Sequence, residues 1–155
     1  MTKNEKLQQT WHDYETQLDH LPTSTKQVVS WAVANGLLSL PEIDPYELLA
    51  EQMAQALRSE TRVDRLGRRY RVNHAVRITS SGVQYTFWGT LGFAPHDHMQ
   101  KAFSQRREQI VGDCLQLKTD VDVYNDLNIG KSPTIQLVLD FQDDVAEREI
   151  GRKAA

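Results

Sequence analysis

The fold of this chain is decided by the segment from Tyr70 to Trp88, which reads YRVNHAVRITSSGVQYTFW. Apolar and polar residues alternate on both sides of Ser81-Gly82, and that dipeptide is typical of a tight turn between antiparallel strands. Because the side chains of a strand alternate between two faces, a turn at this point fixes which residues face each other. The predicted pairs are Ile78 with Tyr85, Val76 with Phe87, Arg77 with Thr86, and Ala75 with Trp88.

A second turn is predicted upstream of this segment, at Leu66-Gly67. A two-residue turn there would place Val63 opposite Tyr70 and Asp64 opposite Arg69. Both turns assign the same sides to the strand that they share, so the sequence predicts a three-stranded antiparallel meander.

Helical patterns surround the meander. Apolar residues recur with a period of 3.6 in four stretches, which predicts helices at about residues 5–20, 25–35, 45–59 and 95–127. After the last of these, residues 134–141 read TIQLVLDF and alternate again. That alternation predicts one further, half-buried strand.

The expected fold class is therefore α+β, with N-terminal helices, a three-stranded antiparallel meander, a long C-terminal helix packed on the sheet and one further strand. A chain of 155 residues is long enough to bury a core of its own. We assign residues 1–22 to an N-terminal amphipathic helix, 23–142 to a single α+β domain, and 143–155 to a charged, frayed tail.

The long helix carries an apolar seam, in which residues recur every seven positions with others four residues later. Such a seam is typical of a coiled coil and predicts a homodimer through residues 95–127. Val111 and Leu115 widen the stripe, so packing of the helix on the sheet is an equally good interpretation. The seam residues are Phe103, Ile110, Cys114, Leu117, Val121 and Tyr124.

The composition is that of an ordinary soluble domain, with 39% hydrophobic and 25% charged residues. No stretch approaches the roughly 18 apolar residues of a membrane span, and the first residues lack the apolar centre of a signal peptide. A single cysteine, Cys114, excludes an internal disulfide and fits a reducing compartment. We therefore expect a cytoplasmic protein with no membrane partner.

The charge is distributed unevenly, although the whole chain has a net charge of only -3. Residues 58–77 read RSETRVDRLGRRYRVNHAVR and hold seven arginines against two acidic residues. The two ends of the chain are acidic: residues 1–57 carry about -5 and residues 119–155 about -4, whereas 78–118 carry about +1. A basic excess of this size in an acidic chain indicates a partner.

Arginine grips phosphate in a bidentate fork, and an aromatic ring offers a platform for nucleic-acid bases. We therefore expect a non-catalytic nucleic-acid-binding or regulatory protein whose arginine-rich hairpin contacts the DNA or RNA backbone. In the main alternative, the arginines pair with acidic groups of the same chain or of a partner subunit, and the protein is a homodimerising interaction module. Small anions are a third class of ligand. The predicted contact residues are Arg62, Arg65, Arg68, Arg69, Arg71, Arg77 and Trp88.

No enzyme constellation is recognisable, so we expect no catalysis, no cofactor and no metal. His96 and His98 stand two residues apart, and on a helix such residues face different directions. No histidine is placed to activate Cys114. The acidic residues of the tail, Asp140 to Glu149, could hold magnesium for hydrolysis only on a rigid frame, which a frayed tail does not supply.

One stretch resembles known sequences. It runs from Gln105 to Cys114 (QRREQIVGDC) and continues through LKTDVD to Tyr124-Asn125. Together with the Arg69–Arg77 strand and the later QLVLDF, it is similar to a segment of uncharacterised bacterial proteins of unknown function. The resemblance implies a bacterial, intracellular setting and no particular activity.

Overall fold

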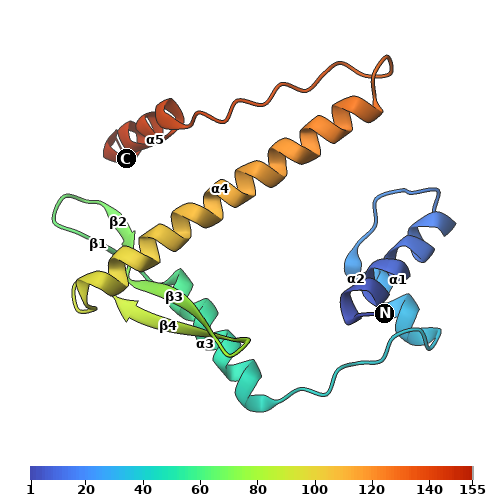
Figure 1. Cartoon of the computed structure of the whole chain (residues 1–155), viewed down its shortest axis with the longest axis horizontal. Coiled ribbons are helices and arrows are strands. Elements are labelled where there is room, and N and C mark those ends of the chain that lie inside the picture. The colour runs from blue at the N-terminus through green and yellow to red at the C-terminus, as the bar shows by residue number, and fades with distance from the viewer. Residues whose placement is uncertain (155) are drawn as a thin grey trace. The chain divides into compact units, whose positions relative to one another are not determined.

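The computed structural model describes residues 1–154, and within them it contains five helices and four strands (Figure 1). The fold is α+β, as predicted, with the long helix packed against a strand. The chain divides into two units, the first ending at Leu49 and the second beginning at Ala50.

The first unit is built on two helices, α1 (Lys3–Gln17) and α2 (Thr25–Ala34). Thr2 and Glu5 begin α1 with a capping box, in which each side chain accepts a hydrogen bond from the other's backbone N–H. The helices meet at Tyr14, which is buried with its ring centroid 5.1 Å from that of Trp31. The Tyr14 hydroxyl also accepts a 3.0 Å hydrogen bond from Gln27, so the polar end of this aromatic contact is satisfied.

Helix α3 (Pro45–Ser59) leads into the second unit. Asp44 caps the start of this helix, because its carboxylate accepts a hydrogen bond from the Tyr46 N–H. Two hairpins, a long helix and a terminal helix come next. They are β1 (Thr61–Val63), β2 (Arg69–Arg71), β3 (Asn73–Ser80), β4 (Val83–Thr90), α4 (His96–Leu127) and α5 (Gln142–Ala154). Helix α5 lies in the segment that the sequence predicts as a charged tail.

The β3–β4 hairpin has the predicted register. All four predicted pairs are present, from Ala75 with Trp88 to Ile78 with Tyr85. Ser81 and Gly82 make the turn, and both have the positive φ that a tight hairpin turn requires. The sequence decides this register because the turn and the alternation agree.

The predicted register of the β1–β2 hairpin is wrong by one residue. Tyr70 lies opposite Arg62 and not opposite Val63. The cause is Asp64, whose carboxylate accepts hydrogen bonds from the backbone N–H groups of Leu66 and Arg68 at 2.9 and 2.8 Å. The loop therefore takes five residues, and since strand side chains alternate, Arg62 moves to the face opposite to Arg69.

The predicted three-stranded meander is divided into two two-stranded sheets. The break between the two sheets lies at Val72, which is buried and whose backbone N–H and carbonyl bond to two different segments. Its N–H donates to Glu60, and its carbonyl accepts from Leu91. Beside it, the buried Asn73 side chain donates to the Leu57 carbonyl and the Glu60 carboxylate. These contacts bend the chain, so one continuous strand cannot form.

Helix α4 is attached to the β3–β4 hairpin by side chains that bond to strand backbone. The Gln105 amide accepts from the Arg77 N–H at 2.8 Å and donates to the Arg77 carbonyl at 2.9 Å, so it covers the outer edge of β3. His98 donates to the His74 carbonyl at 2.9 Å and lies close against Gly89. The His74 ring is buried and meets Phe103 edge-on, with the centroids 5.1 Å apart.

The predicted further strand at 134–141 is not a strand. Residues 133–141 are extended and return along α4 toward its N-terminal half, but they pair with no strand (Figure 1). Asn125 holds the start of this return, because its side chain bonds both the N–H and the carbonyl of Ile135 at 2.9 Å. On the outer edge of β3, Gln105 already bonds the N–H and the carbonyl of Arg77, so those two groups are not open to a third strand.

The second unit buries little apolar surface. Val72, Val76 and Ala102 are its buried hydrophobic residues within the part of the chain that the structure describes. The apolar face predicted for the β3–β4 hairpin is half exposed at Tyr85 and Phe87, and most of the α4 seam is exposed as well. Exposed apolar surface of this extent is typical of sites that contact another molecule.

Candidate functional site

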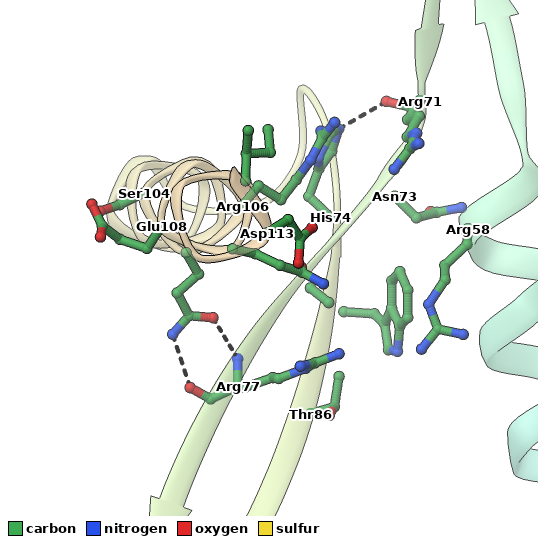
Figure 2. A pocket seen from close by; sticks show the side chains of 15 residues that line it. Arg58, Arg71, Asn73, His74, Arg77, Thr86, Ser104, Arg106, Glu108 and Asp113 are labelled. Atoms are coloured by element: carbon green, nitrogen blue, oxygen red, sulfur yellow. Dashed lines mark hydrogen bonds between the residues drawn. The ribbon is translucent and has the colours of Figure 1, made fainter. Parts of the chain in front are cut away.

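Four arginines from three parts of the second unit line one cleft of about 730 Å³. Arg58 comes from the last turn of α3, Arg71 from the end of β2, Arg77 from the middle of β3, and Arg106 from α4. Trp88 of β4 also lines the cleft. Figure 2 shows the four arginines arranged around the opening. We call this feature the arginine cleft, defined by Arg58, Arg71, Arg77, Arg106 and Trp88.

The register of β3 and β4 explains part of this arrangement. Arg77 lies opposite Thr86, and Trp88 lies opposite Ala75, so the arginine and the indole project from the same face of the hairpin. Trp88 is half-buried, and the Arg58 guanidinium lies 5.5 Å from the centroid of its ring. This cation–π contact holds Arg58 at the mouth of the cleft.

None of the four cleft arginines forms an ion pair with a carboxylate of residues 1–154. Two acidic residues of α4, Glu108 and Asp113, also line the cleft and reduce its positive charge. Glu108 is within 3.3 Å of Arg107, which lies outside the cleft. The cleft therefore keeps an excess of hydrogen-bond donors, and a bound anion could accept from them.

The other predicted contact residues lie away from the cleft. Arg68 is held by Asp64, with Nη2 and Nε each 2.7 Å from the carboxylate. The Arg68 backbone N–H and guanidinium lower the pKa of Asp64, and the Leu66 N–H adds to this effect. Arg62 is 3.7 Å from Glu60, and Arg69 donates to the Thr61 hydroxyl at 3.1 Å. Arg65 lies exposed in the same loop.

Two cleft residues, Arg58 and Arg106, are missing from the predicted contact set. Arg58 belongs to the basic segment, but it ends a helix, and no sequence pattern indicates that this helix end reaches Trp88. Arg106 is brought to the cleft only by the docking of α4 on β3. The only feature of the sequence that could have pointed to these two residues is that both are arginines with no other predicted role.

The predicted seam of α4 is divided by the return of the chain. Phe103, Ile110 and Cys114 form an apolar groove with Leu139 and Phe141, with a volume of about 600 Å³. Further along α4, Leu117 and Tyr124 remain about half exposed and Val121 is less exposed. The seam is thus partly covered by the chain itself, and nothing in residues 1–154 closes the remainder.

One of the two histidines weighed as metal ligands, His98, has a structural contact. His98 bonds the His74 carbonyl, and His74 donates to the Arg71 carbonyl at 2.8 Å. Within residues 1–154, no three His, Cys, Asp or Glu side chains are grouped so that they could hold a metal ion. In the same part of the chain, no helix has the length and apolar character needed to cross a membrane.

Comparison with known proteins gives no relative from which a function could be transferred. No protein-family model, no curated protein and no solved structure matches this chain. The similarity of residues 105–125 to uncharacterised bacterial proteins therefore gains no support, and the geometry of the second unit is the basis for a functional proposal.

Proposed function

We propose that this chain is a non-catalytic nucleic-acid-binding protein that holds the phosphate backbone in the arginine cleft. The observation that supports the proposal is the meeting of four arginines, unpaired with carboxylates in residues 1–154, beside one half-buried tryptophan. Guanidinium groups present planar pairs of N–H donors, which match the oxygens of a phosphodiester.

The size of the cleft favours a single strand. Its volume of about 730 Å³ lies in the range of sites that take small ligands. A single strand could enter it with successive phosphates beside the cleft arginines, whereas a duplex would only touch its rim. Because Arg58 already covers a face of Trp88, a base would stack on the guanidinium or displace it. The expected binding is therefore driven by phosphate and shows little sequence preference.

The test is the affinity for a fluorescein-labelled single-stranded oligonucleotide, measured by anisotropy at about 50 mM salt. Replacement of two cleft arginines, Arg71→Ala with Arg77→Ala, should weaken binding at least about 100-fold, because each charge-assisted contact contributes about 1.5–3 kcal/mol. For the wild type, four neutralised phosphates give a log–log salt slope of about -3 on a single strand. A duplex of the same sequence serves as a second ligand and should bind more weakly.

The matched control removes the same charge from outside the cleft, by Arg62→Ala with Arg68→Ala. This variant should keep its affinity within about threefold, because only long-range attraction is lost. Equal losses in the two double variants, or no binding by the wild type, would show that the cleft is not a nucleic-acid site.

A second candidate function is a protein-interaction module that dimerises through the long helix. The half-exposed Leu117 and Tyr124 favour it, since a coiled-coil partner would cover them. Leu117→Asp should then convert a dimer into a monomer.

A further inference from the structure

Residues 133–141, the extended segment that returns along α4, have backbone groups that make no hydrogen bond within the chain's described residues. Between Gln136 and Asp140, no backbone N–H or carbonyl bonds to another group of residues 1–154. A strand-like segment with free edges is a template for pairing with another strand. Its sequence, TIQLVLDF, also has the alternation and the aliphatic content that strands prefer.

The two sides of this segment differ in exposure. Leu137 and Leu139 are each 36% exposed, whereas Val138 between them is 74% exposed. Leu139 and Phe141 contribute to the groove on α4, so the odd-numbered side chains face the helix. Val138 and its even-numbered neighbours face away from the helix, and the backbone edges are left open to another chain.

We propose that residues 135–141 pair with the same residues of a second copy, as an antiparallel two-stranded ribbon lying on the two α4 helices. A two-fold axis at Val138 matches the sequence to itself over all seven residues. On the helix-facing side, Leu137 meets Leu139 of the second copy and Ile135 meets Phe141 of the second copy. On the outer side, Val138 meets its own equivalent and Gln136 meets Asp140 of the second copy, so no like charges face each other.

A second copy fits this surface better than an unrelated protein, because the pairing is self-complementary about a single axis. It would satisfy backbone groups on one edge of each segment. It would also bring the exposed apolar residues of two α4 helices toward one another, and these belong to a unit that buries few apolar residues of its own. This inference does not depend on nucleic-acid binding, since the arginine cleft shares no residue with 135–141.

The first test uses charge at the two-fold axis, read out by sedimentation equilibrium of the full chain. Val138→Asp places two carboxylates directly opposite each other and should weaken self-association at least tenfold. Val138→Lys should do the same. A mixture of the two variants should associate as a heterodimer at least as tightly as the wild type. Val138 is largely exposed, so neither change removes a packing contact from the single chain.

The second test is a disulfide, with Cys114→Ser as the background. Directly opposed residues of antiparallel strands have Cα atoms about 4.5–5.5 Å apart, within reach of a disulfide. Val138→Cys should therefore cross-link two copies on mild oxidation. Gln136→Cys is the matched control, because its equivalent would lie four residues away along the ribbon, about 13 Å, and should not cross-link.

Several outcomes would overturn the ribbon. They are a wild type that stays monomeric at about 200 μM, a mixture of the Asp and Lys variants that fails to associate, and equal cross-linking at positions 138 and 136. A dimer that is lost with Leu117→Asp but unaffected by both changes at Val138 would assign the interface to the seam alone.

Discussion

The two hairpins follow each other in the chain, and both carry arginines, yet different interactions hold them. The β1–β2 hairpin has strands of three residues and is closed by one loop side chain, Asp64. The β3–β4 hairpin has strands of eight residues and is attached to α4 by Gln105 and His98. One is a local structure and the other depends on tertiary contacts.

The arginines of the two hairpins also differ in their availability to a ligand, although Arg71, at the end of β2, lines the cleft together with Arg77. In the first hairpin, Arg62, Arg68 and Arg69 have partners in their own hairpin or just before it. Arg77 of the second hairpin uses its backbone to bind Gln105, which leaves its guanidinium to the cleft. At Arg77, therefore, the backbone is fixed to α4 while the guanidinium stays available to a ligand in the cleft.

The largest effect on this contrast is expected from Gly89→Ala. A Cβ at this position would lie 2.7 Å from Nε2 of His98 and 2.8 Å from the Ala94 Cβ, so the His98 side chain and the backbone at Ala94 would have to shift. Overpacking of this kind destabilises by about 1–3 kcal/mol. Urea unfolding, followed by Trp88 fluorescence with Trp11 and Trp31 changed to Phe, measures it.

The matched control for Gly89 is Gly112→Ala in α4, where an added Cβ meets no atom within 4 Å. That change should stabilise by up to about 1 kcal/mol, since alanine favours the helix. Destabilisation by both variants, or by neither, would contradict the packing of His98 against Gly89.

An intermediate effect is expected from Gln105→Ala, which removes both hydrogen bonds to Arg77 and exposes the edge of β3. The loss should be about 1–2 kcal/mol, because water can replace the lost partner at this exposed edge. Gln109→Ala is the control, since Gln109 also lines the cleft but makes no hydrogen bond to either strand within residues 1–154. Equal stability of the two variants would mean that the Gln105 side chain does not hold the edge.

The smallest effect on stability is expected from lowering the pH, which protonates the Asp64 carboxylate in the β1–β2 loop. Hydrogen bonds from Arg68 lower the pKa of Asp64, so its carboxylate stabilises the closed loop above the ordinary aspartate pKa of about 3.9. That contribution is lost as the pH falls through the lowered value. The amide ¹⁵N shifts of Leu66 and Arg68 should therefore titrate below about pH 3.9.

Asp64→Asn is the control for this titration, because the amide keeps an acceptor oxygen for the loop but does not ionise. The same shifts should stay flat with pH in this variant. The amide shifts of the β3–β4 hairpin should change neither with the titration of Asp64 nor with Asp64→Asn. A change in those shifts that follows the Asp64 titration would show that the two hairpins are coupled.

Local sequence rules predicted helices α1 to α4 and the β3–β4 register, because caps, turns and periodicity act between near neighbours. They failed at Asp64, where a side chain replaced the expected two-residue turn. They failed again at 134–141, where a strand pattern is present but the segment pairs with no strand. For the site, they selected the basic segment and Trp88 but could not select among its arginines.

By itself, the sequence determined where helices α1 to α4 lie, which β3 and β4 residues face each other, and that positive charge gathers in residues 58–77. Those properties depend on backbone dihedrals, alternation and composition, which are set within a few residues. Only the tertiary structure decided that Arg58 and Arg106 join Arg71 and Arg77 around Trp88, and that Arg62 and Arg68 do not. The reason is physical: the availability of a charged side chain depends on the partners within hydrogen-bond reach, and packing between distant segments selects those partners.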